Sequence, residues 1–224
     1  MRKHPVVFLV DVDNTLLDND GIRSDIQEHF EREYGPTCRD RYWAIQEQLF
    51  VDLGYRDYLG AVQRYRVEHP EDMRSPALAA YLLDYPFADR LYPGALGVLE
   101  RLRAWGPTVV LTDGDAVFQP HKIRRSGIHD AVGGDVLVYV HKEDELEDVE
   151  RRYPAEHYTV VDDKLRILTA VKQAWGERVR TVFPRQGQFA HDPEVIASNP
   201  PADVTVERIG DLLAYDLPDL TGDR

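Results

Sequence analysis

The chain has 224 residues, of which 43% are hydrophobic, and it carries a formal net charge of −13. This length predicts one domain with a large insertion, or a core with a small accessory domain. The hydrophobic content excludes a disordered or fibrous chain. The longest apolar run, Val6–Val10, is the size of a strand and falls far short of the roughly 20 residues that span a bilayer. We therefore expect a globular protein with no membrane partner.

The charge balance also bears on partners and location. Acidic residues outnumber basic ones by 40 to 27, which argues against a nucleic-acid partner, because such binders neutralise phosphates with lysine and arginine. A small phosphorylated substrate remains compatible, since a positive site can lie within an acidic shell. The residues before Val6 are too few for a signal peptide. The single cysteine, Cys38, can form neither an internal disulfide nor a thiolate metal cluster, so we expect a cytoplasmic protein.

Short β-branched runs recur along the chain and predict six strands. They are Val6–Val10, Thr108–Leu111, Val136–Val140, Tyr158–Val161, Val179–Phe183 and Val204–Val206. Most are almost continuously apolar, as strands buried on both faces are. Segments with helical periodicity lie between them, including Ala95–Ala104 and Leu165–Trp175. This alternation indicates an α/β fold with right-handed crossovers and a parallel sheet between two helical layers.

One stretch interrupts the alternation. Between Asp18 and Tyr92 we expect no strand, and four amphipathic segments predict helices at Ser24–Tyr34, Arg39–Leu53, Arg56–Glu68 and Pro76–Leu83. We therefore divide the chain into a catalytic core, residues 1–18 and 92–224, and a small all-α cap, residues 19–91. An insertion placed directly after the first strand's loop can act as a lid. The tail from Ala214 onward, rich in Asp, Pro and Gly, is expected to fray.

Groups that bind metal or phosphate follow four successive strands. In chain order they are Asp11 and Asp13, Thr112 and Asp113, Lys142, and Asp162 and Asp163. Because doubly wound sheets place their sites beyond the carboxyl ends of the strands, we expect these side chains to share one site.

Each of these residues has a simpler explanation when taken alone. Asp163 could cap the helix Leu165–Trp175, Asp113 could stabilise a turn, and Thr112 could end a strand. Lys142 could be a solvated residue in a helix's first turn, although a cation there opposes the helix dipole. Turn chemistry at four strand ends is the less economical account.

Electrostatics explains why these residue types would occur together. Two carboxylates about 4 Å apart repel by about 4 kcal/mol at an effective dielectric near 20. Asp11 and Asp162 would therefore protonate or separate unless a divalent cation lay between them. Oxygen-only ligands suit Mg²⁺, which would hold a phosphate against Asp11 and screen its repulsion.

The same residues predict a covalent phosphate transfer. Attack by Asp11 would give an aspartyl-phosphate, a known form of covalent catalysis. Asp13 can protonate the leaving oxygen and then deprotonate the water that cleaves the intermediate. The Thr112 hydroxyl and the Lys142 ammonium would bind the equatorial oxygens, and we place Asp113 beside them at the phosphate.

These residues, in this order, resemble the motifs of the haloacid dehalogenase superfamily across nearly the whole chain. Asp11-Val12-Asp13-Asn14-Thr15-Leu16 is similar to the first motif, Thr112 to the second, Lys142 to the third, and Asp162-Asp163 to the fourth. The resemblance implies a Rossmann-like core and a helical cap that selects the substrate. It implies Mg²⁺ bound by Asp11, the Asp13 backbone carbonyl and Asp162, with Asp163 either a further metal residue or a helix cap.

The chain departs from the family pattern at three positions. Asn14 stands where the family more often has glycine, Val161 replaces the usual glycine before Asp162, and no proline follows Lys142. Lys122 competes for the role of third-motif lysine. We prefer Lys142, because it follows a strand whereas Lys122 falls within a helical stretch.

The residue two positions after the nucleophile separates the chemistries of the superfamily. Dehalogenases lack an acid there, because a departing halide needs no proton, so Asp13 indicates phosphate esters. We predict an Mg²⁺-dependent phosphatase acting on a small phosphorylated metabolite. A phosphomutase using the same residues, and a non-catalytic regulatory module on the same fold, are the alternatives. A response-regulator receiver does not fit, because its acidic pair comes first and it lacks the insertion.

The remaining motifs indicate no further site. We find neither a P-loop nor a dinucleotide fingerprint. His141 is expected at the surface, and Arg185-Gln186-Gly187 is expected to be an ordinary loop.

Overall fold

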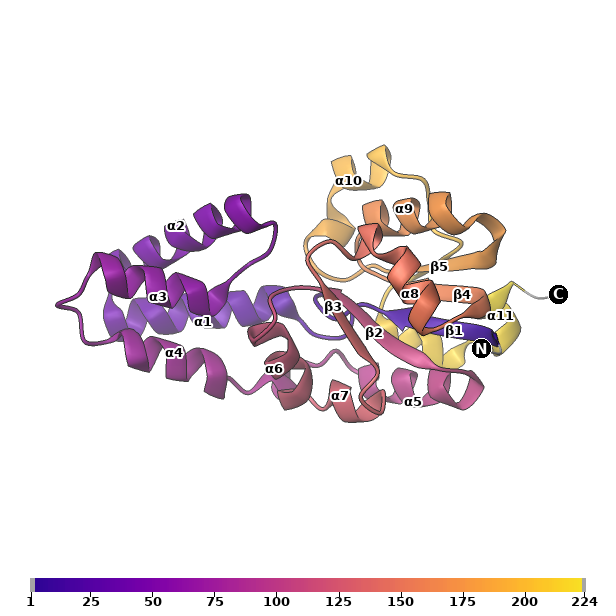
Figure 1. The fold of residues 1–224 in the computed structure, drawn as a ribbon, viewed down its shortest axis with the longest axis horizontal. Coiled ribbons are helices and arrows are strands. Elements are labelled where there is room, and N and C mark those ends of the chain that lie inside the picture. Colours follow the sequence, from indigo (N-terminus) through magenta and orange to yellow (C-terminus); the bar gives the residue numbers. More distant parts are fainter. Residues whose placement is uncertain (1–2, 223–224) are drawn as a thin grey trace.

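The computed structural model describes residues 3–222, whose six strands form one parallel sheet in the order β3-β2-β1-β4-β5-β6 (Figure 1). The strands are β1 (His4–Val10), β2 (Thr108–Asp113), β3 (Val136–Tyr139), β4 (Ala155–Val161), β5 (Val179–Pro184) and β6 (Val204–Val206). The predicted parallel α/β fold is confirmed. The strand order changes direction between β1 and β4, which is where doubly wound sheets form their sites.

Helices cover both faces of the sheet (Figure 1). One face packs against α5 (Ala95–Trp105), α6 (Phe118–Arg125), α7 (Ile128–Ala131) and α11 (Leu217–Thr221), and the other against α8 (Leu146–Arg152) and α9 (Leu165–Trp175). A further helix, α10 (Pro193–Ser198), follows β5. Short 3-10 helices are η1 (Phe87–Arg90), η2 (Lys142–Asp144), η3 (Gly176–Arg178), η4 (Phe189–His191) and η5 (Ile209–Ala214).

The central strand explains the continuous apolar runs. In β1, Phe8 and Val10 pack into the core on one face of the sheet, while Val7 and Leu9 pack into the core on the other. Because successive side chains of a strand point to opposite faces, a strand covered on both faces needs an apolar residue at every position.

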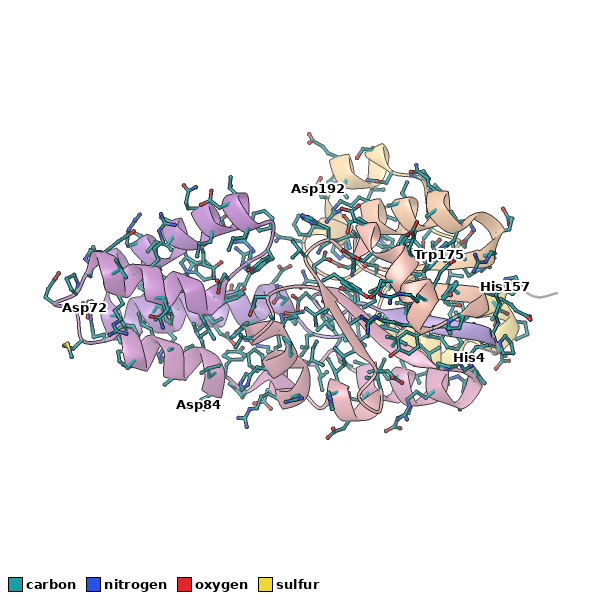
Figure 2. All side chains as sticks on the ribbon, in the orientation of Figure 1. His4, Asp72, Asp84, His157, Trp175 and Asp192 are labelled. Atoms are coloured by element: carbon teal, nitrogen blue, oxygen red, sulfur yellow. The ribbon has the colours of Figure 1, made fainter. Side chains whose placement is uncertain are left out.

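Four helices form a separate bundle at one end of the molecule, namely α1 (Asn19–Tyr34), α2 (Pro36–Leu53), α3 (Tyr58–Glu68) and α4 (Ser75–Asp84) (Figure 1). Their buried side chains make a hydrophobic core of their own, which also includes Phe118 from α6. Asp72, between α3 and α4, lies at the tip farthest from the sheet (Figure 2). The division into a core and a cap at residues 18/19 and 91/92, as separate folding units, stays a prediction.

The bundle's first helix begins five residues before the expected start at Ser24. The Asp18 carboxylate accepts the backbone N–H of Gly21 at 2.9 Å and so caps the helix at Asn19. An aspartate before the first turn satisfies an N–H that has no partner within the helix. The helix therefore extends back almost to the first-motif loop.

Two antiparallel linkers join the bundle to the sheet. Leu17 and Leu91 form an antiparallel bridge, the Asp18 N–H donates to the Arg90 carbonyl at 2.8 Å, and the Tyr92 N–H donates to the Leu16 carbonyl at 2.9 Å. The chain thus leaves and re-enters the core at one place.

The expectation that the tail frays from Ala214 onward is wrong for the residues described. Residues up to 222 include α11, where Leu220 is buried against the sheet and its carbonyl accepts the Thr159 hydroxyl at 2.7 Å. Tyr215 and Leu217 also pack against this core, so the apolar residues of the tail outweigh its turn-like composition. Within the same described range, no helix combines the length and apolar character needed to cross a bilayer.

Candidate active site

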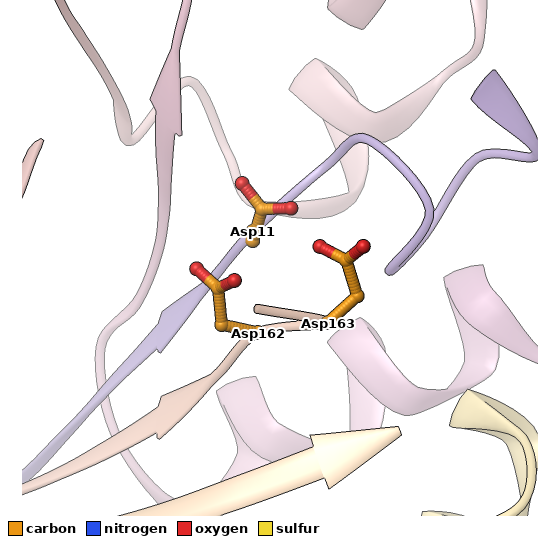
Figure 3. A group of neighbouring side chains, drawn as sticks. All are labelled: Asp11, Asp162 and Asp163. Carbon is orange, nitrogen blue, oxygen red and sulfur yellow. The ribbon is translucent and has the colours of Figure 1, made fainter. Parts of the chain in front are cut away.

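Three carboxylates meet where the strand order changes direction. Asp11 follows β1, Asp162 and Asp163 follow the neighbouring strand β4, and the Asp11 N–H donates to the Val161 carbonyl at 2.9 Å. Figure 3 shows the three side chains gathered at the ends of β1 and β4. All three residues are buried, and one oxygen from each lies within 4.8 Å of the others.

Lys142 enters the same site from η2. Its side chain is buried, and Nζ lies 2.5 Å from Asp11 Oδ1 and 2.6 Å from Asp162 Oδ2. Burial alone would lower the pKa of Lys142, but the carboxylates of Asp11 and Asp162 outweigh it and raise that pKa. Lys142 therefore stays charged. The Asp113 carboxylate accepts the Lys142 backbone N–H at 2.8 Å and holds this turn in place, while its predicted contact with phosphate stays a prediction.

The charges at this site do not balance. Three carboxylates face the Lys142 ammonium in contact and the Lys164 ammonium nearby, which leaves an excess of negative charge within a buried site. Burial raises the pKa of Asp162 to about 6, and burial with the neighbouring Asp162 carboxylate raises the pKa of Asp163. A divalent cation would neutralise this excess and favour the ionised forms.

The unpartnered oxygens fit such a cation. Asp11 Oδ2 and both carboxylate oxygens of Asp163 are buried and have no hydrogen-bond partner in the part of the chain described. Buried polar atoms in native proteins normally have partners, and hard divalent cations such as Mg²⁺ take oxygen ligands. The donor set is therefore chemically suited to a magnesium ion.

Asp163 is not a helix cap. Its carboxylate accepts no backbone N–H from any described residue, whereas the Lys164 N–H at the start of α9 donates to Asp162 Oδ1 at 2.8 Å. The helix-cap alternative for Asp163 is therefore wrong. Its backbone N–H is held by the Thr15 hydroxyl at 3.0 Å, which ties the fourth motif to the first.

Asp13 lies apart from the triad, in a polar cluster with α6. Lys122 Nζ is 2.5 Å from Asp13 Oδ1 and 3.4 Å from Asn19 Oδ1, and the Lys122 side chain is only 2% exposed. The Gln119 amide donates to Asp13 Oδ2 at 3.4 Å and to the Thr112 hydroxyl at 3.0 Å. Lys122 lies in a helix, as expected, and contacts Asp13, whereas Lys142 contacts the triad. Both lysines therefore belong to the site.

The sequence interpretation passed over Gln119 and treated Lys122 only as a rival to Lys142. Their spacing was the available signal, because residues three apart lie on the same face of a helix. The segment that carries them follows the second motif directly.

The backbone conformation of the first-motif loop explains why asparagine can replace glycine at position 14. Asn14 has a φ of 62°, in the left-handed region that asparagine tolerates better than most residues. Gln186 donates to the Asn14 and Thr15 carbonyls at 3.2 and 2.9 Å. Gly187, with a φ of 71°, lies so close that an added Cβ would be 2.5 Å from Asn14 Cβ. Residues 186 and 187 thus support the loop, contrary to the expectation of an ordinary surface turn.

A cavity of about 530 Å³ lies between the helical bundle and the sheet. Asp13 and Lys122 line it, as do Arg23, Tyr55 and other residues of the bundle. Its walls are Phe50, Arg56, Tyr58, Phe118, Leu165 and Phe189, among others, and the exposed His141 also borders it. Volumes of 300–1,000 Å³ are typical of small-molecule sites.

Comparisons with known proteins agree with this architecture. A model of the haloacid dehalogenase-like hydrolase family matches residues 6–174. A haloacid dehalogenase-like hydrolase from Burkholderia xenovorans is 59% identical over 97% of this chain and 99% of its own, with a TM-score of 0.90. Comparison with curated proteins gave no match.

Two more distant structures share the fold alone. An L-2-haloacid dehalogenase from Xanthobacter autotrophicus, with chloropropionic acid covalently bound, is 17% identical over 93% of this chain and 96% of its own, with a TM-score of 0.58. A hydrolase of the superfamily from Bacillus subtilis, bound to magnesium, is 16% identical over 95% and 98%, also with a TM-score of 0.58. From the family match and the Burkholderia relative, the chain belongs to the haloacid dehalogenase-like hydrolases.

Proposed function

We propose that this hydrolase cleaves the phosphate monoester of a small metabolite, with Asp11 as the nucleophile and Mg²⁺ as the cofactor. The observation that carries the proposal is the position of Asp13. Its carboxylate lies at the cavity, two residues beyond Asp11 and apart from the buried triad, where a leaving group would enter. An acid at this place serves an ester and is of no use to a departing halide.

The proposed reaction has two steps. In the first, a carboxylate oxygen of Asp11 bonds to phosphorus, the ester P–O bond breaks, and Asp13 gives its proton to the leaving oxygen. In the second, Asp13 takes a proton from water as the water oxygen attacks phosphorus, which releases phosphate and restores Asp11. Lys142 and the Thr112 hydroxyl, with Asp113 as a further candidate, would stabilise charge on the phosphate oxygens.

The metal would be held by Asp11, Asp162 and Asp163, together with the backbone carbonyl of Asp13. When bound, Mg²⁺ would neutralise the carboxylates and the phosphate, so that an anionic nucleophile can approach an anionic ester. The unpartnered oxygens of Asp11 and Asp163 support this assignment. The magnesium in the distant Bacillus structure is compatible with it.

The experiment is phosphate release from p-nitrophenyl phosphate by the purified chain. We expect turnover with Mg²⁺, its loss on chelation, and at least a 10³-fold loss in Asp11→Asn, because removing a covalent nucleophile typically costs several orders of magnitude. Chloride release from L-2-chloropropionate should be undetectable. Chloride release without phosphate release would overturn the proposal, as would absence of both, which is the outcome for a non-catalytic module.

A phosphomutase would give different products in the same assay. It would move phosphate to a second hydroxyl of a sugar phosphate and release little of it to water. Equal amounts of free phosphate and alcohol, measured on the same sample, are expected for the hydrolase.

A further inference from the structure

Arg23 lies in the second turn of α1 and faces the cavity between the bundle and the sheet. Its side chain is 27% exposed, so most of it is removed from solvent. The guanidinium carbon lies 5.4 Å from the centre of the Trp43 ring. Contact with an aromatic face holds an arginine while leaving its N–H edges free.

Among the described residues, Arg23 has no partner that accepts a hydrogen bond from those donors. Within residues 3–222 its side chain donates no hydrogen bond, and its one carboxylate neighbour is Glu47, with Nη2 3.9 Å from Oε1. That same oxygen accepts a hydrogen bond from Arg56 at 2.8 Å, and Glu47 is 57% exposed. The five N–H donors of a guanidinium are thus left for a ligand in the cavity that Arg23 lines.

The other cations around the cavity are already balanced. Lys122 pairs with Asp13, and Arg166 pairs with Glu143. Lys164 directly follows Asp162 and Asp163 in the chain, so its charge lies beside the carboxylates of the triad. Within the part of the chain described, Arg23 and Arg56 therefore share the Glu47 carboxylate, while Asp20, the remaining charged residue of the bundle at the cavity, accepts the Gln188 N–H at 2.8 Å.

We propose that Arg23 forms an anion subsite that binds a second anionic group of the substrate, a carboxylate or a further phosphate. This inference rests on the proposed function, since the first anionic group is the phosphate at Asp11. The substrate class is then a phosphate monoester of a small hydroxy acid, or a bisphosphate. A planar guanidinium pairs with either group through two parallel hydrogen bonds.

Paired substrates that differ only in charge test the subsite. We would compare 2-phosphoglycolate with ethyl phosphate and 3-phosphooxypropionate with propyl phosphate, which tests a carboxylate as the second anionic group. Ethylene glycol bisphosphate tests a phosphate in the same role. For the unaltered chain, kcat/KM should be higher for the esters that carry a second anionic group than for the alkyl phosphates. Arg23→Gln should lower kcat/KM for them by about 10- to 100-fold, the range for a charged hydrogen bond, mainly through KM. Ethyl and p-nitrophenyl phosphate should change by less than about 3-fold.

A second arginine of the bundle is the matched control. Arg64, on α3, is 51% exposed and is not among the residues around the cavity. Arg64→Gln should therefore leave kcat/KM unchanged for every substrate. Equal losses on charged and neutral esters in Arg23→Gln would overturn the subsite. So would the absence of any preference for charged esters in the unaltered chain.

Binding measurements separate this proposal from the proposed function. Calorimetric titration of Asp11→Asn with 2-phosphoglycolate and with ethyl phosphate requires no turnover. Tighter binding of 2-phosphoglycolate, lost on adding Arg23→Gln, supports the subsite even if p-nitrophenyl phosphate is not hydrolysed. Equal affinities for both esters refute the subsite even if hydrolysis is found.

Discussion

At the scale of single residues, Asp13 carries the proposed distinction between ester hydrolysis and halide displacement, and its surroundings control where its carboxylate points. Lys122 holds one oxygen at 2.5 Å and Gln119 approaches the other at 3.4 Å. Because Lys122 is only 2% exposed, its charge is largely desolvated and its pairing with Asp13 should be stronger than a surface ion pair. We therefore expect Lys122 to position Asp13.

Lys122→Met should impair reactions that depend most on protonation of the leaving group. Without the ammonium, the Asp13 carboxylate can turn away from the ester oxygen. We expect kcat/KM to fall about 100-fold for ethyl phosphate, at the lower end of general acid catalysis, and less than about 5-fold for p-nitrophenyl phosphate, whose leaving group needs little protonation.

The control for this variant is Lys172→Met, which removes a surface ammonium paired with Asp203 and should change neither rate. Equal losses on both esters in Lys122→Met would indicate a structural role for Lys122 and contradict the positioning role.

At the scale of elements, α6 connects the helical bundle to the chemistry. Phe118, at its start, packs into the core of the bundle, and Gln119 and Lys122 reach Thr112 and Asp13. The rings of Phe118 and Tyr58 are stacked with centres 4.7 Å apart, and Phe87 lies edge-on at 5.7 Å. One short helix thus contacts both the core of the bundle and Asp13, the proposed catalytic acid.

Phe118→Ala should cost about 3–5 kcal/mol of unfolding free energy, the usual range for removing a buried phenyl ring and leaving a cavity. Urea unfolding followed by circular dichroism measures it. The neighbouring Val117 is 61% exposed, so Val117→Ala should change the free energy by less than about 0.5 kcal/mol. Similar losses in the two variants would show that Phe118 does not join the bundle to α6.

At the scale of the whole molecule, a charged cluster holds the segment that returns from the bundle to the sheet against α1. Arg90 Nε donates to Asp25 Oδ2 at 3.0 Å and to the Tyr85 hydroxyl at 3.1 Å, so that η1 and α1 are held together. Burial alone would raise the pKa of Asp25, but hydrogen bonds from Tyr85 and Arg90 outweigh it and lower that pKa.

Asp25 should therefore stabilise the fold in a defined pH range. Because its pKa in the folded chain lies below the unfolded value of about 3.9, the contribution is complete above that value and is lost as the pH falls below it. Asp25→Asn should cost about 1 kcal/mol at pH 7, a modest value because the group is partly exposed and screened.

Thermal unfolding of both chains from pH 7 to pH 3 checks this expectation. The difference in Tm should be constant down to about pH 5 and shrink below pH 4. A difference that grows on acidification would contradict the direction of the pKa shift.

Local patterns sufficed for the sheet and for much of the site. All six strands lie where β-branched apolar runs predicted them, since a strand buried on both faces must be apolar throughout. Their ends bring Asp11, Lys142 and Asp162 together, because parallel strands direct their carboxyl ends to one edge. Helix starts were less accurate, as α1 shows, because a side-chain cap can add a turn that hydrophobic periodicity does not reveal.

By itself, the sequence determined the fold class, the motif residues and the place of the helical insertion, because these depend on side-chain type and short-range spacing. The tertiary structure alone decided that Lys122 contacts Asp13, 109 positions away in the sequence. It also decided that, among residues 3–222, the carboxylate oxygens of Asp163 have no hydrogen-bond partner and Arg23 lines the cavity without donating a hydrogen bond. Such pairings depend on how distant elements pack, and packing is set by the whole chain rather than by any local pattern.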